Sequence, residues 1–248
     1  MESAVVAFSG GVDSTLLLAC AQRALGRGAV AFTAKSPSFT PRELDTARGF
    51  CEERGIEHVV AETCEFLDPE YLANTADRCY FCKRALIGRA LEVADERGIR
   101  YLVEGTNASE IDGHRPGHRA SEESERVVSP LLDEGFGEAD VREASKELGL
   151  PTWDMPSEAC LASRVPAGTA ITEELIARIA AAEETLRGLG ARQVRVRHHG
   201  EIARIEVGDD EIGAMLEHRG EIARALGNLG WRFVTMDLKG YRTGSTSV

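Results

Sequence analysis

Residues 8–15, Phe-Ser-Gly-Gly-Val-Asp-Ser-Thr, gather groups that suit phosphate chemistry in one short stretch. An apolar run at residues 4–8 precedes them and another at residues 16–19 follows, which predicts a buried strand that turns directly into a helix. The start of a helix presents unpaired backbone N–H groups and the positive end of the helix dipole, so it attracts anions. Glycines at such a turn let the backbone approach a phosphate closely. We predict that the phosphate-binding residues are Ser9, Gly10, Gly11 and Ser14.

Asp13 is an acid in the middle of this loop. A carboxylate among phosphate-binding groups is useful when a divalent cation such as Mg²⁺ shares the site, so we predict that Asp13 is a catalytic residue that holds the metal. The loop lacks the Gly-Lys-[Ser/Thr] ending of the common nucleoside triphosphatases. Its SGGVDS sequence resembles the pyrophosphate-binding loop of the ATP-pyrophosphatase (PP-loop) superfamily. That resemblance implies ATP as the cofactor, adenylation of a carboxylate or carbonyl oxygen, and release of pyrophosphate. An ordinary glycine-rich turn is the alternative.

A Cys-x-x-Cys motif, Cys79 and Cys82, lies where the pattern predicts the start of a helix over residues 81–97. Two thiolates at this spacing can hold one metal ion or one face of an iron–sulfur cluster. Cys160 lies in a separate loop flanked by prolines and can return to the same place. Three thiolates on a [4Fe-4S] cluster leave one iron open, whereas a structural zinc would need a fourth ligand such as His114 or His118. We favour the cluster over zinc, and three unrelated thiols are the remaining alternative.

The composition of the 248-residue chain excludes several classes of protein. Its net charge of −12 argues against a broad nucleic-acid surface, which depends on lysine and arginine. The apolar runs are too short to span a membrane, and the first predicted strand begins almost at Met1, so we expect a cytoplasmic enzyme without a targeting signal. The other three cysteines, which we expect to be small buried hydrophobic residues, are Cys20, Cys51 and Cys64.

Predicted strands and helices alternate through the first two thirds of the chain, which indicates an α/β fold with a parallel, doubly wound sheet. The predicted strands are residues 4–8, 29–34, 56–61 and 101–104. Ligands of such sheets bind at the carboxyl ends of the strands. The Ser9 loop, Lys35 and the segment Gly105-Thr106-Asn107 all follow strands, so we predict that they share one site, with Gly105 and Thr106 binding the nucleotide. Lys35 is weak evidence by itself, because a lysine at the end of a strand is usually only solvated.

The pattern changes beyond Gly168 to a helix, a hairpin, a helix and a strand. The predicted elements are residues 172–189, 193–198, 201–207, 210–226 and 231–238. We therefore predict two domains. Residues 1–166 form the PP-loop ATP-pyrophosphatase domain, and residues 167–248 form a smaller α+β C-terminal domain for substrate binding or oligomerisation. Within the first domain, the polar residues 109–125 lack periodicity, and we expect them to form a loop.

Arginines alternate with apolar residues in the predicted hairpin. With His199 and Gly200 as its turn, Arg195 and Arg197 share one face, and Arg204 lies across from Arg195. Adjacent guanidinium groups are costly unless an anion or carboxylates neutralise them. The pattern leaves two alternatives open, a bound phosphate or ion pairs with Glu206 and neighbouring acids.

Five further segments resemble the LarE family and, with the loop at Ser9, cover nearly the whole chain. They are RCYFCK (residues 78–83), EGTNASEIDGHRPG (104–117), ACLASRVPAG (159–168), VRVRHHGEIARIEV (194–207) and GYRTGS (240–245). LarE proteins are ATP-dependent sulfur insertases that build the nickel-pincer nucleotide cofactor of lactate racemase. They adenylate a carboxylate of pyridinium-3,5-biscarboxylic acid mononucleotide and replace its oxygen with sulfur, twice over.

The resemblance also implies roles for individual residues. Some LarE members sacrifice the sulfur of one cysteine, and others hold a [4Fe-4S] cluster with three. Cys160 matches the cysteine common to both types, and Cys79 and Cys82 match the extra pair, so this chain resembles the cluster type. The resemblance favours Arg195 and Arg197 as a substrate-phosphate site. It also implies sulfide or another sulfur donor as a partner and, if the hairpin is far from Ser9 within a subunit, a homo-oligomer.

Other functions stay open from the sequence. A tRNA thiolase also combines a PP-loop with cysteines, but the acidic balance and the lack of a separate basic domain count against it. In an amide-forming ligase such as NAD synthetase, the cysteines would be incidental. A nucleotide-sensing module with a structural zinc would have no catalytic activity.

Overall fold

The computed structural model describes residues 1–110, 116–156 and 159–242. The chain divides into two compact units, Met1–Glu158 and Ala159–Val248. The second unit begins earlier in the chain than the boundary at residues 166 and 167 that the sequence suggested. A buried ion pair between Arg164 and Glu183 explains this difference, because it ties the residues around Cys160 to the second unit.

The first unit is built on a parallel sheet in the order β3-β2-β1-β4-β5, which confirms the predicted α/β fold class. The strands are β1 (Ala4–Ala7), β2 (Ala29–Lys35), β3 (Glu57–Glu62), β4 (Tyr101–Val103) and β5 (Val127–Val128). The central strand β1 is flanked on both sides, with Val5 opposite Val30 of β2 and Leu102 of β4. The short strand β5 had no clear signal in the sequence.

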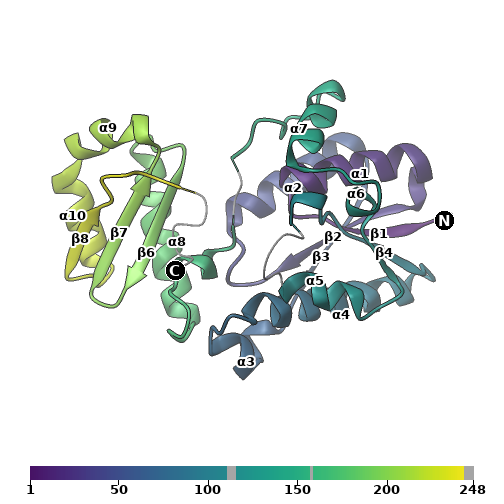
Figure 1. The fold of residues 1–248 in the computed structure, drawn as a ribbon, viewed down its shortest axis with the longest axis horizontal. Helices are drawn as coiled ribbons and strands as arrows, with labels where there is room; N and C mark the ends of the chain where they lie inside the picture. Colours follow the sequence, from purple (N-terminus) through teal and green to yellow (C-terminus); the bar gives the residue numbers. More distant parts are fainter. Residues whose placement is uncertain (111–115, 157–158, 243–248) are drawn as a thin grey trace. The chain divides into compact units, whose positions relative to one another are not determined.

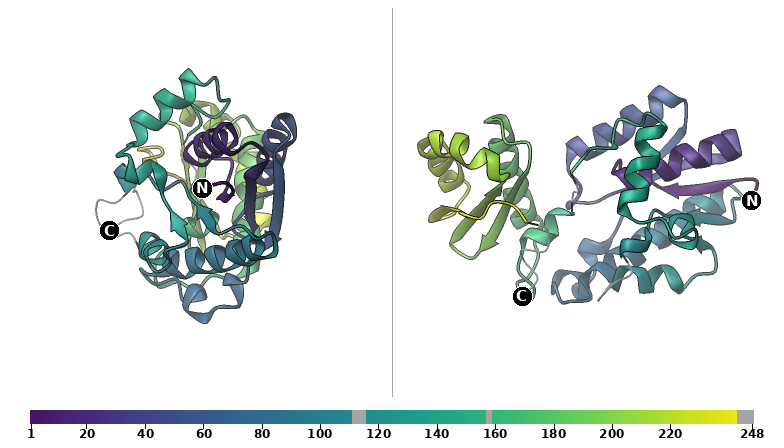
Figure 2. Two further views of the ribbon diagram at one scale, coloured as in Figure 1. Left: turned by 90° about the vertical axis from the view of Figure 1, so that its right-hand side faces the viewer. Right: turned by 45° about the horizontal axis from the view of Figure 1, so that its top comes forward.

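Helices cover both faces of this sheet, as Figures 1 and 2 show. One face carries α1 (Val12–Leu25), α2 (Pro41–Arg54) and α7 (Glu138–Glu147), and the other carries α4 (Arg78–Glu96) and α5 (Pro116–Glu122). Two shorter helices are α3 (Pro69–Leu72) and α6 (Pro130–Asp133). Each face buries its own apolar cluster, so the sheet is enclosed and only its edges reach solvent.

Three local features explain where these helices begin. Thr40 and Glu43 form the expected capping box at the start of α2: each accepts a hydrogen bond from the other's backbone N–H. Helix α4 begins at Arg78 rather than at residue 81, so both cysteines of the Cys-x-x-Cys motif lie inside it. Pro116 starts a helix within the segment that we expected to be a loop, because proline fits the first turn of a helix.

The second unit has a three-stranded sheet in the order β6-β7-β8. Its strands are β6 (Val194–His199), β7 (Ile202–Val207) and β8 (Phe233–Met236), with β7 antiparallel to β6 and parallel to β8. Its helices are α8 (Glu173–Gly188), α9 (Ile212–Glu217) and α10 (Arg219–Asn228). The single helix expected over residues 210–226 is thus two helices that meet at His218. Neither unit contains a helix, in the part that is described, with the length and apolarity to cross a membrane.

Candidate functional site

The loop between β1 and α1 folds around the Ser14 side chain. The Ser14 hydroxyl lies 3.1 Å from the Ser9 hydroxyl and donates to the Gly11 carbonyl at 3.2 Å. The Gly11 N–H donates to the Ser9 hydroxyl at 3.3 Å, so the loop is closed by short-range hydrogen bonds. Gly11 caps α1 without a side chain, which leaves the start of the helix accessible to an anion. The predicted phosphate loop therefore has the geometry that its sequence suggested.

Two glycines permit this geometry for different reasons. Gly10 has a φ of +80°, a backbone conformation that other residues rarely adopt. A Cβ at Gly105 would lie 3.3 Å from the Ser14 backbone nitrogen and 3.5 Å from the Asp13 Cβ. The segment after β4 thus packs directly against the first turn of α1, which brings two of the predicted site segments together.

Asp13 is oriented by Asn107, which lies in the predicted edge segment but had no role assigned from the sequence. The Asn107 side-chain amide donates to Asp13 Oδ1 at 2.7 Å, and its own oxygen accepts the Ser109 N–H at 2.9 Å. Asn107 is buried, so both ends of its amide are held. In the described part of the chain Asp13 Oδ2 accepts no hydrogen bond, and a carboxylate oxygen of this kind suits a divalent cation.

Glu104, at the carboxyl end of β4, is the most heavily bonded side chain of this edge. It is 1% exposed and accepts hydrogen bonds from Lys83 at 2.6 Å, Thr106 at 2.7 Å and Ser129 at 2.5 Å. Burial raises the pKa of Glu104, but the Lys83 charge and the three hydrogen bonds outweigh it and hold that pKa below its ordinary value. The Thr106 hydroxyl, predicted to bind the nucleotide, is thus turned toward Glu104.

Lys35 lies at the carboxyl end of β2, as expected. Its ammonium pairs with Glu62 of the neighbouring strand at 3.3 Å, and both side chains are exposed. An exposed pair of this kind contributes little to stability, so Lys35 can exchange partners readily. A role for Lys35 in nucleotide binding stays a prediction.

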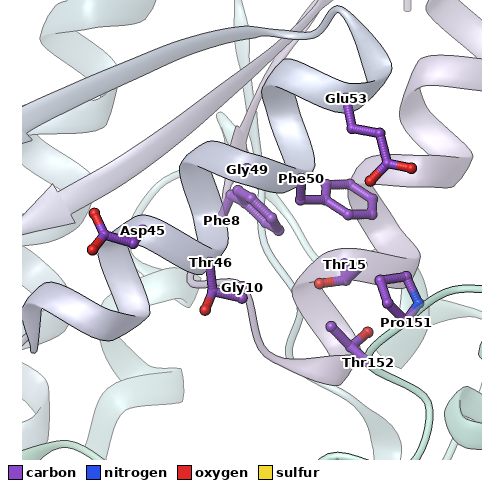
Figure 3. Close-up of a pocket in the computed structure, with 10 residues that line it drawn as sticks. All are labelled: Phe8, Gly10, Thr15, Asp45, Thr46, Gly49, Phe50, Glu53, Pro151 and Thr152. Carbon is purple, nitrogen blue, oxygen red and sulfur yellow. The ribbon is translucent and has the colours of Figure 1, made fainter.

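A cavity of about 180 Å³ lies beside the loop, between α1 and α2 (Figure 3). Phe8, Phe50 and Gly10 line it, and so do the hydroxyl-bearing Thr15 and Thr152. Both threonine hydroxyls are buried and have no hydrogen-bond partner in the described part of the chain. The cavity is therefore roomy and polar enough to hold ordered water behind the loop.

Cys79 and Cys82 lie on successive turns of one face of α4, near its beginning. Cys79 is exposed and Cys82 is half-buried, so the pair is accessible to a ligand. Within residues 1–110, 116–156 and 159–242, no three His, Cys, Asp or Glu side chains are grouped to hold a metal ion. His114, one of the zinc ligands considered, lies outside the described residues, and Nε2 of the other, His118, is 3.6 Å from Glu122.

The other three cysteines differ from one another. Cys51 is buried as expected, and burial, with the Glu52 carboxylate, raises the pKa of its thiol to about 12. Cys20 and Cys64 are exposed, so the expectation that they are buried was wrong. Cys20 lies at an exposed position of the otherwise buried helix α1, where a single residue breaks the pattern. Burial of part of its side chain still raises the pKa of the Cys20 thiol.

Cys160 is an exposed residue of the second unit, directly before a short 3₁₀ helix, Leu161–Arg164. Arg164 is 3% exposed and donates to the carbonyls of Ala159 at 2.5 Å and Cys160 at 3.0 Å. The opposite edge of its guanidinium forms two hydrogen bonds with Glu183, at 2.8 and 3.0 Å. The backbone of the Cys160 segment is thus fixed by a buried arginine while the thiol stays accessible.

The hairpin of β6 and β7 has a different register from the one predicted. Arg197 lies across from Arg204, and Arg195 lies across from Glu206. The prediction that Arg204 faces Arg195 was wrong, because the two-residue turn at His199 and Gly200 was placed one position away from the observed pairing.

Carboxylates meet part of the positive charge on this hairpin. Arg197 donates twice to the buried Glu206, at 2.9 and 3.1 Å, and also to the Ser163 carbonyl at 3.1 Å. Arg204 bridges the other oxygen of Glu206 and Asp237. Arg195 is buried, donates to the Val194 carbonyl and lies over the Tyr241 ring. The ion-pair alternative therefore accounts for Arg197, and its role with a substrate phosphate stays a prediction.

Three residues of these sites were not predicted as such, namely Glu104, Arg164 and Glu183. Glu104 belongs to a segment already singled out, and polar residues at the end of a buried strand are a usable signal. Glu183 lies in the middle of an amphipathic helix, where an acid is normally solvated. Only the folded structure shows that it faces Arg164.

Comparisons with known proteins cover the whole chain. The pattern of the asparagine synthase family matches residues 3–124. An uncharacterized protein of Synechocystis is 41% identical over 98% of this chain and 91% of its own length. The pyridinium-3,5-bisthiocarboxylic acid mononucleotide synthase of Lactiplantibacillus plantarum is 39% identical over 98% of this chain and 88% of its own. A glutamine-hydrolyzing GMP synthase of Methanothermobacter thermautotrophicus is 31% identical, but over 60% of this chain only. The similarity to the first two relatives extends through both units.

Proposed function

Because this chain belongs to the LarE family of pyridinium-3,5-bisthiocarboxylic acid mononucleotide synthases, we infer that it is an ATP-dependent sulfur transferase. Its substrate is pyridinium-3,5-biscarboxylic acid mononucleotide, and its product supplies the nickel-pincer nucleotide cofactor. The observation that carries this proposal is the juxtaposition of the Ser9–Gly11 loop with Asp13 and Asn107 at one edge of a parallel sheet.

The first half of the reaction activates a carboxylate. A substrate carboxylate oxygen attacks the α-phosphorus of ATP, pyrophosphate leaves, and a mixed anhydride with AMP forms. The backbone N–H groups at the start of α1 and the Ser9 and Ser14 hydroxyls are suited to hold the departing pyrophosphate. Gly10 and Gly11 leave the backbone open to a close approach by phosphate oxygens.

Asp13 would hold Mg²⁺ in this complex. Asn107 occupies Oδ1 of the carboxylate and fixes its plane, which leaves Oδ2 to the metal. Mg²⁺ prefers one or two carboxylates together with phosphate oxygens, and this arrangement offers one carboxylate at the phosphate loop. When bound, the metal would neutralise charge on the phosphates.

The second half replaces AMP with sulfur. An anionic sulfur attacks the activated carbonyl carbon, the bond to AMP breaks, and a thiocarboxylate remains. We propose Cys79, Cys82 and Cys160 as ligands of a [4Fe-4S] cluster that would supply this sulfur as a bound sulfide. Two accessible thiols on one face of α4 and an accessible third thiol at Cys160 support the proposal. Sacrifice of the Cys160 sulfur is the alternative within the same family.

We further propose that Arg195 and Arg197 bind the substrate phosphate, that sulfide or a sulfur donor supplies the consumed sulfur, and that the enzyme is a cytoplasmic homo-oligomer. The position of both arginines on one strand supports the phosphate site. Arg197 is already held twice by Glu206, so a phosphate would have to share this guanidinium with a carboxylate. The two arginines are therefore tested separately.

The test is anaerobic reconstitution with iron and sulfide, followed by reaction with ATP, Mg²⁺ and the pyridinium mononucleotide. Mass spectrometry of the nucleotide should show replacement of oxygen by sulfur, together with AMP and pyrophosphate. A brown protein with visible charge-transfer absorbance supports the cluster. Adenylate without any sulfur-containing product would overturn the sulfur transfer and leave an amide-forming or other adenylating enzyme.

A further inference from the structure

Glu104 connects three parts of the first unit that the proposed reaction must keep together. Its carboxylate bonds Lys83 of α4, Thr106 of the following loop and Ser129 after β5. All three donors lie within 2.7 Å of it, and the carboxylate is almost completely buried. A carboxylate with every oxygen engaged by short, charge-assisted hydrogen bonds has little freedom to move.

Lys83 links this carboxylate to the thiols. It follows Cys82 directly and lies four residues after Cys79, so Cys79 and Lys83 share a face of α4. The Lys83 side chain is 24% exposed, whereas the exposed Arg84 next to it pairs with Asp68. Of these two neighbouring cations, Lys83 is therefore the one that fixes the start of α4 to the sheet edge.

The residues after Glu104 link the same carboxylate to the nucleotide loop. Gly105 abuts the first turn of α1 so closely that a Cβ would crowd the Ser14 nitrogen, and Asn107 holds Asp13. The four-residue segment 104–107 thus contacts the thiol-bearing helix at one end and the phosphate loop at the other. These two elements lie on opposite faces of the sheet, and the segment crosses the edge between them (Figure 1).

We propose that Glu104 is a positioning residue for sulfur transfer: through Lys83 it holds the Cys79 and Cys82 turns of α4 in fixed register with the Ser9 loop. The proposal rests on the proposed function, since it assigns sulfur chemistry to this thiol pair. Transfer of sulfur to an adenylated carboxylate needs the two reacting groups within near-contact distance, and small displacements are costly for such steps. Adenylation itself uses different contacts and depends less on α4.

The competing explanation is that Glu104 and Lys83 are only a structural ion pair. Removal of one partner from a buried pair leaves an uncompensated charge, which destabilises a protein for reasons unrelated to catalysis. The double variant Lys83→Met, Glu104→Gln separates the two explanations. It removes both charges and so relieves the electrostatic penalty, but it also removes the strong hydrogen bond that holds α4.

The experiment compares the wild type, Glu104→Gln, the double variant and the control Arg89→Met, which removes another cation of α4 in an exposed pair with Glu92. Three quantities are measured: the thermal midpoint, the rate of pyrophosphate release, and the rate of formation of the thionated nucleotide. We expect the double variant to melt close to the wild type and to release pyrophosphate within about threefold of it, but to lose about a hundredfold in thionation. Arg89→Met should match the wild type throughout.

A second measurement does not depend on sulfur transfer. Iodoacetamide alkylation of Cys79 and Cys82 is followed by mass spectrometry with and without ATP and Mg²⁺. ATP should slow alkylation in the wild type and in Arg89→Met, and this protection should be lost in the double variant. If the wild type forms no thionated product, the proposed function fails, and the alkylation result alone decides whether Glu104 couples the two elements.

Two results would overturn the inference. Recovery of thionation and of ATP protection in a stable double variant would mean that the pair is only structural. An equal loss of pyrophosphate release and thionation would mean that Glu104 serves the nucleotide loop and not the thiols.

Discussion

Arg164 and Glu183 form a buried, two-pronged ion pair in the second unit, with Nε to Oε1 at 2.8 Å and Nη2 to Oε2 at 3.0 Å. Glu183 also accepts the Val196 N–H at 3.0 Å, so it joins α8 to β6 as well as to the Cys160 segment. The other edge of the guanidinium binds the carbonyls on either side of the Ala159–Cys160 peptide. The thiol expected to take part in sulfur transfer is therefore held by its backbone and not by its side chain.

Glu183→Gln should destabilise the protein and disable sulfur transfer. It leaves the buried Arg164 charge without its carboxylate, and the loss of one partner of such a pair costs about 3–5 kcal/mol. Urea unfolding followed by circular dichroism measures this loss. Arg187→Gln is the matched control, because Arg187 contacts the same carboxylate more weakly, at 3.4 Å. Equal effects of the two substitutions would refute a special role for Arg164.

Asp13→Asn should leave the fold intact and abolish adenylation, because the metal loses its anionic ligand. Asn107→Leu should weaken adenylation less, by about tenfold, since it frees the Asp13 carboxylate to rotate but leaves its charge in place. Pyrophosphate release, measured over a range of Mg²⁺ concentrations, separates the two variants. Full activity in Asp13→Asn would remove Asp13 from the mechanism.

The cysteines should divide into two groups. Cys160→Ala should still form adenylate but lose sulfur transfer, while Cys20→Ala and Cys64→Ala keep both, because these exposed thiols lie outside the proposed set. If the cluster is correct, Cys79→Ala and Cys82→Ala also lose the visible absorbance and the transfer. Retention of activity in those two variants, with loss of the mass of H₂S from Cys160, would show instead that Cys160 is sacrificed.

The two hairpin arginines should respond differently to substitution. Arg195→Ala should weaken binding of the pyridinium mononucleotide about ten- to a hundredfold, since a charge-assisted phosphate bond contributes roughly 1.5–3 kcal/mol. Arg197→Ala should also lower the thermal midpoint, because it removes two hydrogen bonds from the buried Glu206. Isothermal titration with the mononucleotide and with ATP separates the effects. If Arg195→Ala weakens both ligands equally, its role is structural.

Stability should fall on acidification through the loss of the Glu104 contacts. The pKa of Glu104 in the folded protein lies below its ordinary value of 4.5, so its contribution to stability is fully present above that value. The contribution is lost as the pH falls below 4.5 toward the folded-state pKa. Urea unfolding from neutral pH down to about pH 3 measures the slope, and Glu104→Gln should flatten it. An unchanged slope in that variant would mean that other carboxylates dominate.

The nucleotide half of the site could be predicted because its signals are local. A strand that turns into a helix at Ser9 fixes where the N–H groups point, and the parallel sheet brings Gly105 to the same edge. The start of α4 was placed three residues late, because the Cys-x-x-Cys motif carries no capping signal of its own. The exact pairing in the hairpin was missed because an error of one residue in the turn changes every cross-strand partner.

The partners of buried charges could not be predicted from the sequence. Glu104 with Lys83, Glu183 with Arg164 and Glu206 with Arg197 are each brought together by tertiary packing. In the sequence each acid is one of 41 acidic residues, and most acids of a globular protein are solvated. Only their burial in the folded chain distinguishes them.

The boundary between the two units has a consequence for protein engineering. Cys160, the carbonyl-binding Arg164 and the supporting Glu183 all belong to the second unit, Ala159–Val248. A chimera that takes this unit from one relative and the nucleotide half from another would therefore transplant the cysteine with the groups that orient its backbone. The same division makes the two halves separately exchangeable in a gene library, in which the donor of Cys160 and the donor of the Cys-x-x-Cys helix can be varied independently.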